Sequence, residues 1–302
     1  ELPDEWADLV RRCMAMEADR PAPADEIMLY QMIVGAWPLK LEPTDAQGCD
    51  AFRDRIVAWQ RKALREAKLR TSWAAPNDEY ERLAAGFVGA VLSPGSAFKS
   101  ALYSFVKRVA LAGAVNGLVQ AVLKMTVPGV PDFFQGTDLW DFSLVDPDNR
   151  RPVDFGTRQA ALASPSKLRD MLAGWRDGRI KQYVIRTVLQ LRSDMDNVFA
   201  HGDYIPLTVS GPGANNVIAF ARRSDSGVVA VVLPRLIARF LSDTGTLGVD
   251  IGALEGTEVL LPESCRQIDW SGLFGQSSVG PAERISVPSL LANFPLAVLV
   301  SW

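Results

Sequence analysis

The chain has 302 residues, of which 48% are hydrophobic and 22% are charged, and its formal net charge is −3. This composition is typical of an ordered globular protein and excludes a disordered chain. The small negative charge gives no electrostatic reason to expect binding to nucleic acid or to an anionic membrane. The length is sufficient for two or three hydrophobic cores.

The cysteines bear on the compartment. Cys13, Cys49 and Cys265 are far apart and odd in number, so they suggest neither a disulfide framework nor a zinc site. We therefore expect a reducing, cytoplasmic location. The first residues lack a basic segment followed by an apolar one, so no signal peptide is expected. Because the chain begins with Glu1 rather than Met, we expect its start to be a cut within a longer protein.

Hydrophobic periodicity predicts that residues 1–125 form a helical region. The expected helices span residues 3–17, 25–37, 44–70, 77–92 and 96–124. The third begins at Thr44-Asp-Ala-Gln47, which matches a capping box. Its expected apolar face carries Phe52, Ile56, Trp59, Ala63 and Ala67, and Trp6 and Trp59 are expected in the core.

One of these helices contains the longest apolar stretch. Residues 109–123 include Asn116 and Gln120, and the stretch is shorter than the roughly 20 residues that span a membrane. We therefore expect a buried helix and no membrane partner.

The pattern changes at residue 126. Prolines and glycines surround a very short apolar run in residues 127–136, which predicts a brief strand followed by a loop. Residues 137–155 are polar and without periodicity, and long loops of this kind often carry function. Ser164-Pro165 predicts the start of two helices that reach about residue 192.

Beyond residue 202 the hydrophobic period becomes two, which predicts strands. The expected strands are residues 216–223, 227–234, 259–261, 285–287 and 296–302. They would form an all-β terminal module of about 100 residues.

The residue types restrict the chemistry. The chain has one histidine, His201, which leaves a Ser-His-Asp triad improbable and excludes a histidine-rich metal site. It has no dinucleotide-binding glycine motif and no Walker loop. Carboxylates, arginines and aromatic platforms remain, and these are the groups with which enzymes process sugars.

The loop supplies such groups. Trp140 could stack on a sugar face, and Arg150 could hold hydroxyls or a carboxylate that binds them. The structural alternative is that these residues, with Pro147, Asn149 and Pro152, only hold the loop together. In that reading Arg150 braces the loop against Asp146 or Asp148.

The predicted helix over residues 44–70 is strongly basic. Its cations are Arg53, Arg55, Arg61, Lys62, Arg65, Lys68 and Arg70. A solvated face with intrahelical pairs such as Lys62 with Glu66, a face toward a sugar or a barrel, and a nucleic-acid surface all remain open.

Several motifs now combine. Residues 127–141 and 144–154, with those at 29–38, 62–68, 71–73 and 76–81, resemble the C-terminal portion of the maltooligosyl trehalose synthases of the α-amylase superfamily. Weaker similarity continues through residues 177–181, 202–207, 220–223 and 232–236. The chain departs conservatively at Asp138, where the family usually has Glu, and at Phe134, where Tyr is common.

The resemblance implies an α+β fold in three parts. Residues 1–125 would be a helical insertion, residues 126–196 the last strand, loop and helices of a TIM-type barrel, and residues 197–302 a β-sandwich. Residues 131–136 would be the eighth barrel strand, at whose end active sites lie. The family isomerises the reducing-end α-1,4 linkage of maltooligosaccharides to α,α-1,1 by intramolecular transglucosylation. Its catalytic carboxylates would lie upstream of Glu1, so this chain alone would be inactive.

The resemblance and the loop chemistry together give the substrate-binding candidates. They are Arg150, Asn149, Asp148, Asp138, Gln135, Trp140, Lys62 and Arg65. No cofactor and no metal are expected, and the partners would be a maltooligosaccharide and the N-terminal barrel portion of the same enzyme. Another hydrolase or glucanotransferase of the superfamily, a carbohydrate-binding module and a nucleic-acid-binding helical protein are the alternatives.

Overall fold

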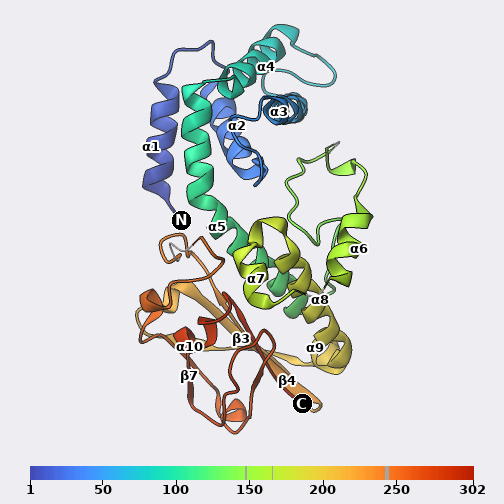
Figure 1. Ribbon diagram of the computed structural model, residues 1–302, viewed down its shortest axis with the longest axis vertical. Helices are drawn as coiled ribbons and strands as arrows, with labels where there is room; N and C mark the ends of the chain where they lie inside the picture. Colours follow the sequence, from blue (N-terminus) through green and yellow to red (C-terminus); the bar gives the residue numbers. More distant parts are fainter. Residues whose placement is uncertain (147, 165, 242–244) are drawn as a thin grey trace. The chain divides into compact units, whose positions relative to one another are not determined.

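The computed structural model describes residues 1–146, 148–164, 166–241 and 245–302 (Figure 1). The chain divides into two compact units, which are described separately. The helical unit comprises Leu2–Ala110 and Asp141–Val153. The mixed unit comprises Glu1, Leu111–Trp140 and Asp154–Trp302.

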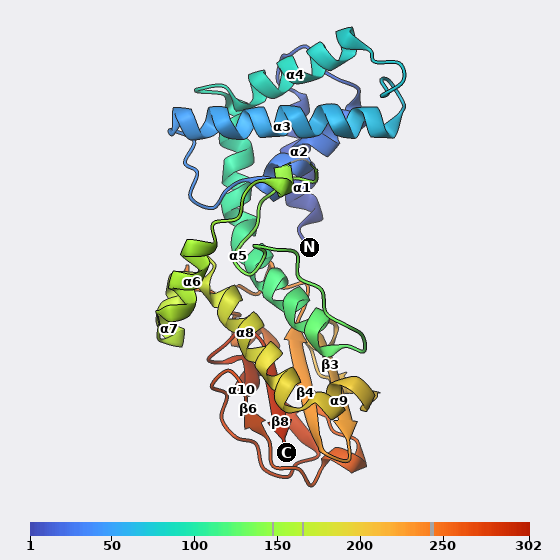
Figure 2. The ribbon, with the colours of Figure 1, turned by 90° about the vertical axis from the view of Figure 1, so that its right-hand side faces the viewer.

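The predicted helical region is confirmed. It contains α1 (Pro3–Met14), α2 (Pro23–Ala36), α3 (Ala46–Ala67), α4 (Asp78–Leu92) and α5 (Ala97–Thr126), of which α5 continues into the mixed unit (Figure 2). The side chain of Asn77 caps α4 by accepting a hydrogen bond from the Tyr80 N–H, as expected. The cap of α3 differs from the prediction. Asp45, not Thr44, accepts from the N–H of Gly48 at 2.9 Å.

Aromatic rings fill the core of the helical unit. Trp37 packs edge-on against Phe52 with ring centroids 5.3 Å apart, and Phe87 packs edge-on against Phe98 at 5.9 Å. On α3, Phe52, Ile56 and Trp59 are buried as predicted, and Trp6 packs against the same core while partly buried. Ala67 is exposed instead, and Leu64 is buried, because the last turn of α3 extends beyond the core.

Helix α5 is longer than the apolar run that marks it in the sequence. Its 30 residues are long and apolar enough to cross a membrane by length and composition, and half of the apolar stretch is buried inside the structure. This corrects the expectation that no stretch reaches that length. A core helix satisfies the same criterion, and the expected burial is found at Val115, Leu118 and Val122.

The mixed unit adds four helices among its described residues before the sheets begin. They are α6 (Phe155–Ala163), α7 (Leu168–Ala173), α8 (Arg179–Asp194) and α9 (Asp196–His201). The prediction missed α6 and α9. Ser164 ends α6 with its N–H on the carbonyl of Ala160, so it does not begin the next helix. Pro165 lies outside the described residues.

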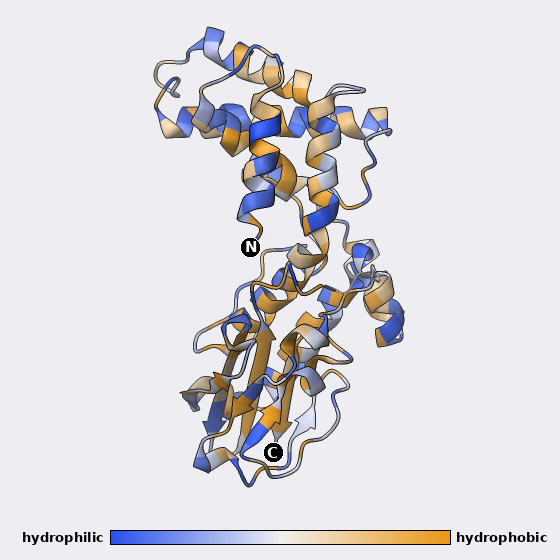
Figure 3. Ribbon diagram, turned by 90° about the vertical axis from the view of Figure 1, so that its left-hand side faces the viewer, coloured by the Kyte–Doolittle hydropathy of each residue, from blue (hydrophilic) through white to orange (hydrophobic). Residues whose placement is uncertain are grey.

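The predicted β module contains two antiparallel sheets. The first, in the order β1-β3-β4-β8-β6, consists of β1 (Asp203–Pro206), β3 (Val217–Ser224), β4 (Gly227–Pro234), β8 (Ala297–Ser301) and β6 (Ser271–Gly272). The second, in the order β2-β5-β7, consists of β2 (Thr208–Ser210), β5 (Glu258–Leu260) and β7 (Arg284–Ser286), and the short helix α10 (Val287–Leu291) follows it. The strands predicted at residues 216–223 and 227–234 are found as the hairpin of β3 and β4, in which Ser224 is the last residue of β3 and pairs with Gly227. The strands are mostly hydrophobic (Figure 3).

The strand predicted in residues 127–136 is absent. These residues follow α5 as coil and turn, and Val130 is 95% exposed. A parallel barrel strand needs hydrogen bonds from neighbouring strands, and the chain as described pairs none with this segment. The end of a TIM-type barrel is therefore not formed here.

A buried arginine connects the helices of the mixed unit to its sheet. Arg222 of β3 is 2% exposed and donates to the carbonyls of Thr126, Phe199 and Gly202. These carbonyls end α5 and α9, where the helix dipole favours a cation. Burial lowers the pKa of the Arg222 guanidinium, and the nearby Arg192 acts in the same direction.

The cap of α3 gives a direct test. Asp45→Ala should lower the free energy of unfolding by about 1 kcal/mol, because the Gly48 N–H loses its acceptor. Thr44→Ala, one residue away and equally exposed, should leave it unchanged within about 0.5 kcal/mol. Urea unfolding followed by circular dichroism measures both. If Thr44→Ala lowered the free energy of unfolding more than Asp45→Ala does, Thr44 would be the cap of α3, as the capping box predicts.

Candidate functional site

The residues Asp141–Val153 form the site loop, which belongs to the helical unit. The Leu144 side chain is 2% exposed and joins the aromatic core of that unit. The side chain of Asp141 accepts from the N–H and the hydroxyl of Ser143 at 2.9 and 2.6 Å. The loop therefore has a buried anchor and a local turn. Among its described residues only Asp148–Arg150 has regular structure, a single 3-10 turn.

Asp148 is the centre of the site loop. Its carboxylate accepts hydrogen bonds from Nε of Arg55 at 3.0 Å and from Nη2 at 2.8 Å. The same carboxylate accepts from the N–H of Leu144 at 2.7 Å, and Nε of Arg151 lies 3.0 Å from it. Arg55 also donates to the carbonyl of Phe142 at 2.7 Å. One carboxylate thus joins helix α3 to Leu144 and Arg151, which lie on either side of it in the loop.

The charge state of Asp148 follows from these contacts. Burial raises the pKa of its carboxyl, but the Arg55 hydrogen bonds, the Leu144 N–H and the charges of Arg55 and Arg151 outweigh burial and hold the pKa below its ordinary value. Asp148 is therefore ionised at neutral pH. It serves as an acceptor and cannot act as a proton donor there.

The predicted residue Arg150 forms an ion pair with a second carboxylate, that of Asp146. Nε of Arg150 lies 2.7 Å from Oδ1 of Asp146, whose other oxygen accepts from Nζ of Lys62 at 3.1 Å. The Arg150 side chain is 72% exposed, so this pair contributes little to stability and leaves most of the guanidinium accessible. The bracing alternative named Asp146 or Asp148 as the partner, and the structure selects Asp146. Lys62 thus binds the loop rather than Glu66.

Asn149 lies between Asp148 and Arg150 in the single 3-10 turn. Its Oδ1 is buried and has no hydrogen-bond partner among the described residues. Pro147, which precedes this turn, lies outside the described residues.

Arg65 has a different setting from the one expected for a sugar ligand. It makes a two-pronged pair with Glu81, at 2.7 Å from Nε and 2.8 Å from Nη2, and it lies 4.9 Å from the ring centre of Trp73. The Arg65 hydrogen bond lowers the pKa of Glu81, with help from the Thr71 hydroxyl and against burial. In the helical unit Arg65 therefore holds the turn between α3 and α4.

The other predicted residues belong to the mixed unit. Asp138 accepts from Nε of Arg158 at 3.0 Å and from the amide of Gln182 at 2.7 Å. Aspartate thus makes both bonds at this position, although the family usually has the longer Glu. Gln135 and Phe134 are exposed.

Trp140 is fixed by its neighbours. Its Nε1 donates to the carbonyl of Trp175 at 2.6 Å, and its ring lies against Gly117 of α5. The backbone of Gly178 lies close to that of Trp140, because a Cβ at Gly178 would be 2.8 Å from the backbone nitrogen of Trp140. The φ of Gly178 is +82°, which favours glycine. Trp140 therefore has a structural role in the mixed unit.

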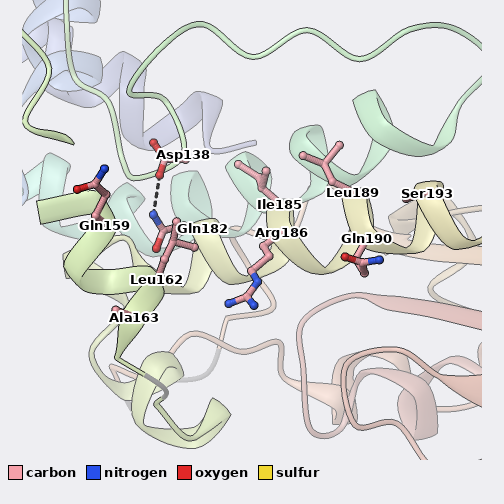
Figure 4. A pocket seen from close by; sticks show the side chains of 10 residues that line it. All are labelled: Asp138, Gln159, Leu162, Ala163, Gln182, Ile185, Arg186, Leu189, Gln190 and Ser193. Atoms are coloured by element: carbon pink, nitrogen blue, oxygen red, sulfur yellow. Dashed lines mark hydrogen bonds between the residues drawn. The ribbon is translucent and has the colours of Figure 1, made fainter. Parts of the chain in front are cut away.

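A hollow of about 800 Å³ opens beside Asp138 (Figure 4). Its apolar lining comes from α6 and α8, chiefly Leu162, Ile185 and Leu189. Gln159, Arg186 and Gln190 add polar groups. Asp138, its one carboxylate, is held by Arg158 and Gln182. Glycoside chemistry needs two carboxyl groups flanking the reacting bond, so this hollow does not provide a catalytic pair.

The described residues contain no group of three or more His, Cys, Asp or Glu side chains that could hold a metal ion. Around the site loop, the carboxylates of Asp146 and Asp148 are both paired with cations. The arrangement can recognise hydroxyl groups through arginine and amide donors. Asp141, the third carboxylate of the loop, forms no ion pair among the described residues and accepts from Ser143 instead.

Sequence reasoning missed some of the groups that shape these sites. Arg55 and Asp146 were recognised only as a helix cation and a bracing partner, although the spacing of seven between Arg55 and Lys62 places both on one helix face. Arg158 and Gln182 gave no local signal, because their partner Asp138 is 20 and 44 residues away.

Comparison with known proteins shows which proteins this chain is similar to. No protein-family model matches the chain. A putative maltooligosyl trehalose synthase of Mycobacterium tuberculosis (strain H37Rv) is 37% identical over 231 residues, which is 76% of this chain and 28% of that protein. The curated relative therefore extends well beyond the matched part.

Solved structures agree. The maltooligosyltrehalose synthase from Arthrobacter ramosus is 28% identical with a TM-score of 0.76, covering 99% of this chain and 35% of that one. A hypothetical maltooligosyl trehalose synthase of Sulfolobus tokodaii is 27% identical with a TM-score of 0.69, covering 100% and 35%. The predicted resemblance to the maltooligosyl trehalose synthases is confirmed. The chain spans about a third of the length of these relatives, consistent with the C-terminal portion of such an enzyme.

The lowered pKa of Asp148 predicts a pH dependence. Its stabilising contribution is present above the unfolded pKa, near 3.9, and is lost as pH falls through the lower folded pKa. Asp148→Asn should lower the free energy of unfolding by roughly 1.5–3 kcal/mol at pH 7, and the difference from wild type should shrink below pH 4.

Urea unfolding between pH 7 and pH 3 measures this difference. Asp50→Asn is the matched control, because Asp50 pairs with Arg53 on the exposed side of α3 and its side chain is 58% exposed. A difference for Asp148→Asn that stays constant down to pH 3 would show that its ionisation does not stabilise the fold.

Proposed function

We propose that the chain is the C-terminal portion of an enzyme that isomerises the reducing-end α-1,4 linkage of maltooligosaccharides to an α,α-1,1 linkage. The reaction is an intramolecular transglucosylation in trehalose biosynthesis. The observation that carries the proposal is the similarity of nearly the whole chain to maltooligosyl trehalose synthases, combined with an arginine-rich loop held open to solvent. The names of the relatives do not favour another hydrolase, a glucanotransferase or a binding module.

In this proposal residues 131–136 become the eighth strand of a TIM-type barrel and the loop after it when the other strands are present. Residues 126–196 then form the end of the barrel, residues 1–125 the helical insertion and residues 197–302 a β-sandwich that caps it. The exposed Val130 and the apolar hollow lined by α6 and α8 support the proposal, because barrel strands would cover such surfaces. The partner of this chain is the rest of the barrel of the same enzyme. The enzyme would be located in the cytoplasm and would bind neither a membrane nor nucleic acid.

The chemistry divides between the two portions. The nucleophile and the acid of a retaining mechanism belong to the remainder of the enzyme, which forms the glucosyl intermediate. The residues of this chain bind and orient the sugar. Arg150 offers an accessible guanidinium and Asn149 an amide, while the ionised Asp148 holds the turn that carries both. The site loop also helps to exclude water, so that the cleaved glucose, and not water, accepts the glucosyl group.

The division of labour predicts inactivity of the chain alone. The purified 302-residue chain should form no trehalose-ended product from maltopentaose, because the candidate site lacks a catalytic carboxylate pair. Product analysis by chromatography measures this, with the Mycobacterium tuberculosis relative as positive control. Turnover by a sample whose intact mass excludes a longer species would overturn the proposed division.

Arg150 carries the second prediction. In the intact enzyme, Arg150→Lys should lower kcat/KM on maltopentaose about tenfold or more, which corresponds to ~1.4 kcal/mol, because lysine cannot offer two parallel hydrogen bonds. The melting temperature should not change, since the side chain is largely exposed.

Arg53→Lys is the matched control, because among the described residues Arg53 pairs with its helix neighbours Asp50 and Asp54. It should keep wild-type kinetics. If Arg150→Lys also keeps wild-type kcat/KM and melting temperature, Arg150 only braces the loop against Asp146.

A further inference from the structure

Arg55 contacts the site loop at two separate points. Its Nε and Nη2 reach the Asp148 carboxylate, and its Nη2 also reaches the Phe142 carbonyl at 2.7 Å. The side chain is 20% exposed, so water competes with these hydrogen bonds only at one side.

The base of this contact is rigid. Arg55 lies in the middle of α3, beside the buried Ile56 and within 5.9 Å of the ring centre of the buried Phe52. A guanidinium is planar and offers its donors in a fixed fork, so its orientation is passed on to the carboxylate that it holds. Lys62, two turns further along the same helix, holds Asp146.

The contact determines the conformation of the residues that follow. Asp148, oriented by Arg55, accepts from the Leu144 N–H at 2.7 Å and so joins two loop residues that lie four positions apart. Asn149 and Arg150 come next, in the 3-10 turn that Asp148 begins. Their side chains can present a fixed set of donors only while that turn is held.

We infer that Arg55 is a positioning residue for sugar recognition: acting through Asp148, it holds Asn149 and Arg150 in the conformation that binds the substrate. The inference rests on the proposed function and deepens it. It makes the helical unit the part of the chain that organises the substrate loop, and it explains why the site loop belongs to that unit although its neighbours in sequence belong to the mixed unit.

Two measurements test the inference separately. In the 302-residue chain, Arg55→Ala and Arg55→Lys should increase hydrogen exchange of the Leu144 amide and of peptides covering residues 141–153 at least tenfold. Exchange in the β3–β4 hairpin should not change. In the intact enzyme, the same variants should raise KM for maltopentaose about tenfold with kcat within twofold, because binding rather than the chemical step is weakened.

Arg53→Ala is the control in both experiments, since Arg53 lies on the same helix and pairs with Asp50 and Asp54. Arg55→Lys keeps the charge and decides the outcome if Arg55→Ala does not fold. Unchanged loop exchange in Arg55→Lys overturns the positioning role. Faster loop exchange with unchanged KM, or a fall in kcat alone, overturns the role of Arg55 in sugar recognition.

The outcomes distinguish the inference from the proposed function. If the wild-type intact enzyme makes no trehalose-ended product, the proposed function fails, and loop exchange still decides whether Arg55 holds the loop. If the wild type is active and loop exchange responds while KM does not, only the recognition role of Arg55 fails.

Discussion

The structure around the candidate site depends on one ion pair, between Asp148 of the site loop and Arg55 of α3. A thirteen-residue loop with one short turn cannot satisfy its own polar groups through regular secondary structure. Here a single carboxylate accepts from a guanidinium and from a backbone N–H, while the guanidinium also binds a backbone carbonyl. The loop thereby acquires a defined shape from a helix that precedes it by about 90 residues in the sequence.

The arginines of α3 and Arg150 of the site loop have unequal roles, and the burial of their side chains explains the difference. Arg55 and Arg65 are about 20% exposed and each makes a two-pronged pair with a carboxylate, so both fix local geometry. Arg150 is largely exposed, and its pair with Asp146 exchanges readily with other acceptors. Partly buried pairs therefore hold the framework, whereas the Arg150 guanidinium is largely open to solvent.

In the mixed unit a different buried cation has the organising role. Arg222 binds three backbone carbonyls from the ends of α5 and α9, and it forms no ion pair with a carboxylate of the described residues. Arg192 binds the carbonyls of Met125 and Gly129 in the same way. The two arginines fix the point at which the chain leaves α5 for residues 127–136. Those residues have no partner strands among the described ones, and the adjacent apolar hollow fits a unit that other elements of a larger enzyme would cover.

The sequence by itself determined the features that depend on near neighbours. Helical periodicity, the Asn77 cap and the turn between β3 and β4 involve residues within a few positions of one another, and their motifs also indicated the family. The tertiary structure decided the rest. The 127–136 segment failed to form a strand because a strand requires hydrogen bonds from other strands. Arg55 and Arg65 have similar surroundings in the sequence, yet one holds Asp148, 93 residues away, and the other holds Glu81, 16 residues away. Which carboxylate a helix cation reaches is set by the packing of distant segments, and no local pattern encodes it.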